Sequence, residues 1–355
     1  MPRIGRGKGP AVTSTRPESP AIAPDTSSVA QPAGSSAAPR RRRAQPIGRW
    51  AVFGTYLLIV VVVFLLRRET FSEWATWQGI LQQSAIPVIV VVGLTITLIG
   101  GDFDLSIGAV LGFGMALSIV FMAEVGISWP LACLLALAIC AVIGVVNGVL
   151  VTRLRVNSFI GTLAMTSVVA GIDAKVTGQE TISTGVPVEF ADVGIQAIFG
   201  MSVAFWLAVI ASIVLYVVVS HTEWGRFLYA TGENSTAARL AGVRVRAIRT
   251  WGFVAAAAAA GAGGILLASQ NASYYPGAGG GYLLPAYAAA FLGTAVGAGR
   301  FGVLASVFGV IFLQTLQTGL TVLNVEPWIV LVVQGLVLVV AVMVSAFGAS
   351  ARRST

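Results

Sequence analysis

Histidine and cysteine are nearly absent from this chain. Its 355 residues include one histidine, His221, and two cysteines, Cys133 and Cys140. The cysteines lie seven residues apart in one apolar segment, where packing explains them better than a disulfide bridge. Because there is no His/Cys cluster, the common zinc-binding patterns are excluded and we expect no metal site. No nucleophile–base pair is recognisable either, so we expect no catalytic residues and a membrane enzyme is poorly supported.

Charge is also scarce. Charged residues make up 10% of the chain, hydrophobic residues make up 56%, and the mean hydropathy is +0.87. This composition excludes an ordinary soluble globular domain. Several apolar runs approach the roughly 20 residues that cross a hydrocarbon core of about 30 Å, and they lack the strict alternation of barrel strands. The sequence therefore predicts an all-α fold, a polytopic transmembrane helical bundle embedded in the lipid bilayer.

The basic excess belongs to the N-terminus. Residues 1–49 carry nine Lys or Arg and two acidic residues, and they are rich in Pro, Ala, Ser and Gly. We predict that 1–49 form a disordered basic tail and that 50–350 form the membrane domain. The run Arg40 to Arg43 acts as a topology signal or contacts anionic lipid. Because the excess is confined to this tail, it does not indicate nucleic-acid binding.

About ten membrane segments are expected. With both termini cytoplasmic, ten spans place 19 of the 22 Lys and Arg on the cytoplasmic side, in agreement with the positive-inside rule. Small residues at four-residue spacing within these segments predict close helix packing, either static or sliding during transport. The expected segments are 50–66, 80–99, 105–123, 128–152, 158–176, 202–220, 250–270, 284–298, 303–323 and 328–347.

The loop 221–249 is unusually basic for so apolar a chain. Its stretch "GENSTAARLAGVRVRAIRT" begins a short helix at Asn234 or Ser235, either of which is able to cap it, and Gly242 suits the position just past its end. Ala237 and Ala241 give the helix a small-residue face beside Arg239. We interpret the helix as a knob that docks into a groove of a partner. A solvated loop that only sets topology is the alternative.

Three ordered motifs resemble the ribose/xylose-type permease subunits of bacterial ABC sugar importers. "GRFLYATGENSTAARLAGVRVRAIRT" resembles their cytoplasmic coupling segment. "GGDFDLSIGAV" resembles the family's Gly-Gly-Ile-Asp-Leu-Ser-Val-Gly, with Asp102 in place of the second glycine. "GYLLPAYAAAFLGTAVGAGRFGVLASVFGV" resembles a third block, in which Leu283 and Pro285 replace an acidic pair common in ribose permeases. The resemblance covers about residues 80–350 and does not fix the solute.

This resemblance implies a transport subunit of the bacterial inner membrane rather than an enzyme. It implies a second permease copy, an extracytoplasmic solute-binding protein and a cytoplasmic ABC ATPase as partners. The chain has no G-x-x-x-x-G-K-[ST] P-loop, so ATP would be used by the partner and no cofactor by this chain. The residues implied to couple to the ATPase are Arg226, Gly232, Asn234, Ala237, Ala238, Arg239 and Gly242.

The carboxylates of "GGDFDLSIG" are expensive inside a membrane and therefore need a role. Asp104 is placed to cap the next helix through the backbone N–H of Ser106 or Ile107. Alternatively Asp102, Asp104, Ser106 and Tyr282 line the solute path. An ion-coupled secondary transporter is the competing function, since such proteins place ionisable residues within the bundle.

Overall fold

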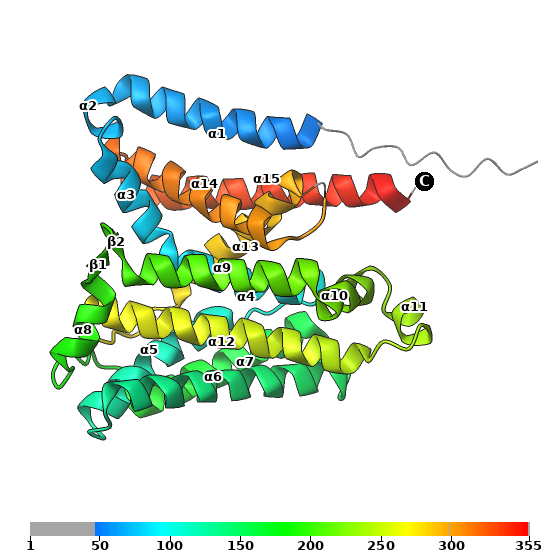
Figure 1. The fold of residues 1–355 in the computed structure, drawn as a ribbon, viewed down its shortest axis with the longest axis horizontal. Helices are drawn as coiled ribbons and strands as arrows, with labels where there is room; N and C mark the ends of the chain where they lie inside the picture. The colour runs from blue at the N-terminus through cyan, green and yellow to red at the C-terminus, as the bar shows by residue number, and fades with distance from the viewer. Residues whose placement is uncertain (1–46, 298, 354–355) are drawn as a thin grey trace, which may run out of the picture. The chain divides into compact units, whose positions relative to one another are not determined.

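The computed structural model describes residues 47–297 and 299–353, in which helices dominate (Figure 1). The helices up to the hairpin are α1 (Ile47–Leu66), α2 (Arg68–Phe71), α3 (Trp74–Gln83), α4 (Ala85–Ile99), α5 (Ile107–Ala123), α6 (Trp129–Thr152), α7 (Ser158–Thr177) and α8 (Val188–Ile195). The remaining helices are α9 (Val203–His221), α10 (Glu223–Glu233), α11 (Ser235–Leu240), α12 (Val245–Asn271), α13 (Gly280–Val296), α14 (Val303–Val322) and α15 (Pro327–Arg353).

A small hairpin is the departure from an all-α fold within these residues. Strands β1 (Ala197–Ile198) and β2 (Met201–Ser202) pair antiparallel, with Ala197 opposite Ser202. The turn residues Phe199 and Gly200 both have positive φ, as tight two-residue hairpin turns require. The hairpin leads directly into α9 and leaves the helical prediction otherwise intact.

Each predicted membrane segment coincides with a helix, with one instructive difference. The expected segment 80–99 is divided into α3 and α4, which are bent by 42° relative to each other. Pro87 has no N–H to donate to the carbonyl of Gln83, so the helix cannot continue unbroken through this point. The predicted tail falls almost entirely on residues 1–46, which lie outside the described residues, and α1 begins at Ile47 rather than at residue 50.

Five helices of the described residues are long and apolar enough to cross a membrane, or six if the bent pair α3 and α4 is counted as one span. Shorter apolar helices cover Val52–Leu66, Ile107–Ala123, Gly280–Val296 and Pro327–Met343. The structure therefore supports a helical membrane domain. The count of ten spans stays a prediction, because α5 and α13, with 17 residues each, fall short of the length of an untilted crossing.

Helix α12 lies at the centre of the packing and contacts α4, α5 and α6 closely. Ala256 and Ala260 are fully buried. A Cβ added at Gly264 would overlap the carbonyl oxygen of Leu111 in α5, and one added at Gly144 of α6 would lie 2.6 Å from the carbonyl oxygen of Phe253. The backbones approach to a distance that leaves no room for side chains. The predicted small-residue packing is thus confirmed for these helices.

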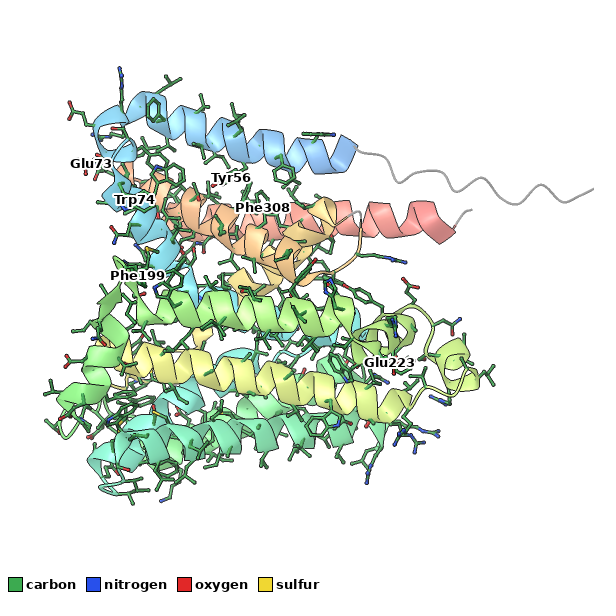
Figure 2. All side chains as sticks on the ribbon, viewed as in Figure 1. Tyr56, Glu73, Trp74, Phe199, Glu223 and Phe308 are labelled. Atoms are coloured by element: carbon green, nitrogen blue, oxygen red, sulfur yellow. The ribbon has the colours of Figure 1, made fainter. Side chains whose placement is uncertain are left out.

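The start of α13 is also positioned by glycine contacts. Gly279 lies against Gly108 and Gly112 of α5, so closely that a Cβ at Gly279 would overlap the Gly108 carbonyl. Farther along α13, Gly309 of α14 packs on the carbonyl of Ala289. Aromatic contacts then join α14 to α1, where the rings of Tyr56 and Phe308 meet edge to face with centroids 5.5 Å apart (Figure 2). These contacts connect α5 to α1 through α13 and α14.

We predict that Gly264→Ala destabilises the chain by about 1–3 kcal/mol, because the added methyl group must push α12 away from α5. Gly171→Ala is the matched control: Gly171 is also helical and has no atom within 4 Å of an added Cβ. It should be neutral or stabilising by up to about 1 kcal/mol. Thermal unfolding in detergent measures both variants. Equal melting temperatures for the two would show that the α5–α12 contact does not limit stability.

Candidate functional site

The junction between α4 and α5 holds a buried ion pair. Arg249 of α12 donates from Nε to Oδ2 of Asp102 at 2.6 Å and from Nη2 to Oδ1 of the same carboxylate. Asp102 is 2% exposed, whereas the Arg249 side chain is 27% exposed. A two-pronged guanidinium–carboxylate contact is among the strongest polar contacts in proteins. The pair therefore fixes the α4–α5 junction to the first turns of α12.

Asp104 lies just before the start of α5. Its Oδ1 accepts hydrogen bonds from the N–H of Ser106 at 3.0 Å and from the Ser106 hydroxyl at 2.6 Å, which confirms the predicted contact to Ser106. The Ser106 hydroxyl in turn accepts from the Asn147 amide of α6 at 2.8 Å, and the Asp104 N–H donates to the Tyr287 hydroxyl of α13 at 2.9 Å. Asp104 thus joins α5 to α6 and α13.

One oxygen of Asp104 stays without a partner. Oδ2 is buried and accepts no hydrogen bond from the described residues, and the same holds for Oδ1 of Asn147. Buried polar atoms of this kind usually bind water or mark a functional position. The geometry establishes the contacts of Asp104 with Ser106, without a side-chain cap on α5 itself, and leaves the solute role of Asp104 as a prediction.

Tyr282 lies in a different environment from the carboxylates. It lines a cavity of about 330 Å³ among α3, α4, α12, α13, α14 and α15, to which Asp102, Asp104 and Ser106 do not contribute. The four residues expected along a solute path are therefore divided between a polar helix junction and this cavity. The cavity is lined by residues at the start of α4 and the end of α12, whereas the junction lies at the end of α4 and the start of α12, so the two are separate features.

The coupling segment consists of α10 and α11 and lies beside the N-terminal end of α12 (Figure 1). Asn234 caps α11 by accepting from the N–H groups of Thr236 at 3.1 Å and Ala237 at 2.9 Å, as predicted. Gly242 has φ of 86°, which confirms its expected place just past the helix end. The loop of the sequence prediction is therefore a capped and ordered helical segment.

The surface of α11 includes the expected small-residue face and one prominent residue besides. Ala237, Arg239 and Ala241 are exposed, whereas Ala238 is 5% exposed and packs inward. Leu240 is 86% exposed and was not among the predicted coupling residues. An apolar side chain at so prominent a position indicates a contact surface. In the sequence, a leucine between Arg239 and Ala241 in a basic loop was the signal that could have predicted this contact surface.

The coupling segment is attached to the membrane helices at several points. A Cβ at Gly232 would overlap the carbonyl of Ile99, so α10 touches the end of α4 directly. Tyr229 donates to the Phe301 carbonyl at 3.0 Å, and Arg300 pairs with Glu233. Burial raises the pKa of the Tyr229 hydroxyl and the nearby Arg300 lowers it less strongly, so Tyr229 remains a donor at neutral pH.

A second cavity of about 360 Å³ lies where the α10–α11 turn meets the α4–α5 junction. Its lining includes Gly101, Gly232, Asn234 and the ion-paired Arg249. Arg226 lies outside it, exposed on α10 and paired with Glu223 at 3.4 Å, at the start of the helix (Figure 2). The predicted coupling residues therefore share one segment without forming a single pocket. Sequence reasoning singled out Asp102 and the basic loop that ends at Arg249, and missed their pairing.

No cluster of three or more His, Cys, Asp or Glu side chains suited to a metal ion occurs in the described part of the chain. The polar groups present here are hydrogen-bonding and structural: an ion pair, a helix cap and amide groups. Such groups hold helices in register and bind polar solutes.

Comparisons with known proteins agree with this arrangement. The ribose import permease protein RbsC of Escherichia coli (strain K12) is 31% identical over 295 residues, which cover 81% of this chain and 91% of that protein. RbsC of Bacillus subtilis (strain 168) is 33% identical over 82% of this chain and 90% of its own length. The autoinducer 2 import system permease protein LsrC of Escherichia coli O9:H4 is 31% identical over 80% of this chain and 84% of its own.

No solved structure matches the chain. The model of one protein family, described as the permease component of branched-chain amino acid transport systems, matches residues 77–342. The match begins in α3 and ends in α15, so it includes the α4–α5 junction, the coupling segment and both cavities. The chain therefore belongs to this family of transport permease components and is an integral membrane protein that resembles the permeases of ABC sugar importers.

Proposed function

We propose that this chain is the membrane-spanning permease subunit of an ATP-binding cassette importer in the bacterial inner membrane, and that it forms the path for a monosaccharide or a related small polar solute. The observation that carries the proposal is the capped helix α11 with its exposed Leu240, attached to α4 through Gly232 and Ile99. Such a helix suits a groove on a separate ATPase chain, which would supply the energy.

The coupling step follows from these contacts. Closure of the ATPase pair would displace α11, and the contact of Gly232 with Ile99 would pass that displacement to α4. The Asp102–Arg249 pair would carry it to α12. Both oxygens of Asp102 are bound by Arg249, which favours this mechanism over the ion-coupled transporter considered as the alternative, since that carboxylate is not free to bind an ion.

The proposal includes partners on both sides of the membrane. A solute-binding protein would deliver the solute outside, a second permease copy would complete the translocation path, and ten spans would place both termini in the cytoplasm. The names of the relatives, import permeases for ribose and autoinducer 2, support a small polar solute. No cofactor is assigned to this chain.

The proposed function predicts how substitutions in and next to α11 affect coupling to the ATPase. Leu240→Ala should weaken binding of the ATPase about tenfold or more, because a central apolar anchor is removed. Gly242→Val should misplace α11, since valine is strained at a φ of 86°. Both variants should insert normally and lose solute-stimulated ATP hydrolysis in the assembled complex. Arg239→Glu should behave similarly if the groove is acidic.

Gly126→Val is the matched control for Gly242→Val. Gly126 has φ of 73° and, like Gly242, has open space around an added Cβ. The control carries the same backbone strain in the turn between α5 and α6, away from α11. Normal hydrolysis in Leu240→Ala and Gly242→Val would show that α11 is not the coupling element.

The proposed function also predicts the orientation of the chain in the membrane. Thr236 lies in α11, beside the start of α12, whereas Ser183 follows Ile182, which pairs with Tyr274 just past the end of α12. The 27 residues of α12 separate the two sites by about 40 Å. In intact cells, an impermeant thiol reagent should label Ser183→Cys and leave Thr236→Cys unlabelled. The parent chain, with Cys133 and Cys140, gives the background, and labelling of Thr236→Cys from outside would reverse the orientation.

A further inference from the structure

The cavity that contains Tyr282 is lined by an unusual number of amides. The chain has eleven glutamines, and six of them surround this cavity of about 330 Å³. They are Gln82, Gln83, Gln270, Gln314, Gln317 and Gln334. Amide groups within a membrane domain are costly unless they are satisfied or face a polar space. Their gathering from α3, α12, α14 and α15 around one cavity indicates a path for something polar.

The lining carries no charge. It includes no Asp, Glu, Lys, Arg or His, and between the amides lie apolar residues such as Pro285 and Ala286. A solute with a charged group would lose water here without meeting a counter-charge, which is strongly unfavourable in a low-dielectric site. Amides both donate and accept hydrogen bonds, and so do hydroxyl groups. The lining therefore suits an uncharged solute with many hydroxyls.

Two pairs of these glutamines are already bonded to each other. Gln314 donates to Gln83 at 3.1 Å, and Gln334 donates to Gln317 at 3.1 Å. These contacts hold α14 to α3 and to α15 and orient the remaining amide atoms. By contrast, the side chains of Gln270 and Tyr282 make no hydrogen bond to another described residue. Gln270 and Tyr282 are thus the groups of the lining that are available to a solute.

We infer that this cavity is a solute subsite of the permease and that it binds an uncharged polyhydroxylated molecule through Gln270 and Tyr282. The hydroxyl of Tyr282 and the amide of Gln270 contact solute hydroxyls, and the apolar lining covers its carbon skeleton. This inference rests on the proposed function, since it assigns the solute class of the same transport path. It places solute binding at the glutamine cavity and leaves Asp102 and Asp104 with their structural contacts at the helix junction.

The test is a binding measurement on the full-length chain in lipid nanodiscs, by saturation-transfer difference NMR. The probes are D-ribose and xylitol as uncharged polyols and L-leucine as a zwitterion of similar size. We expect saturation transfer to both polyols and none to L-leucine. Gln270→Leu and Tyr282→Phe should each weaken polyol binding roughly two- to tenfold, the effect of losing one hydrogen bond. Neither substitution breaks an internal hydrogen bond, so both proteins should keep the parent melting temperature.

Gln196→Leu is the control, because Gln196 is an exposed glutamine at the end of α8 and outside the cavity. It should bind polyols as the parent does. Saturation transfer to L-leucine that both cavity variants weaken would overturn the inference, and so would polyol binding that is equal in Gln270→Leu and Gln196→Leu. No ATPase is needed. Polyol binding without ATPase coupling would count against the proposed function alone, and coupling without polyol binding against this inference alone.

Discussion

The close approach of helix backbones around α12 is the constraint on which the rest of the structure depends. In lipid, the hydrophobic effect contributes little to helix association, so the helices must be stabilised by close van der Waals contact. Gly144 of α6 and Gly264 of α12 supply that contact by having no side chain. Because α12 is held on α4, α5 and α6 together, its first turns are fixed in space, and Arg249 can meet Asp102 at the helix junction.

The polar groups then perform two separate tasks. Asp102 and Asp104 hold helices together, the first by an ion pair and the second by hydrogen bonds with Ser106 and Tyr287. The glutamines of α3, α12, α14 and α15 face a cavity in which no charge is present. A membrane protein that separates these tasks can keep charged residues away from the surface that meets the solute. Its solute surface can then be polar without the desolvation penalty that unpaired charges would bring.

Much of this architecture follows from the sequence, because its causes are local. Apolar runs of sufficient length predict the helices, and an Asn cap followed by a glycine past the end predicts α11. Other features depend on which helices meet. The pairing of Asp102 with Arg249 joins residues 147 positions apart, and no local pattern fixes such a contact. The glutamine cavity was missed for the same reason: each glutamine looks like an isolated polar residue until four helices bring them together. The spacing of Gln314 and Gln317 on one face of α14 was the signal available.

The two ends of α10 have a mechanical consequence. Gly225 lies against the carbonyl of Val219 in α9, and Gly232 lies against the carbonyl of Ile99 in α4. Backbone meets backbone at both points, with no flexible side chain between them to absorb a displacement. A displacement of α11 is therefore transmitted to α9 and α4 together, because no side chain can rearrange to absorb it. The helix α10 is therefore a rigid connection from α11 to α4 and α9, and Gly225 and Gly232 determine how closely it is held against them.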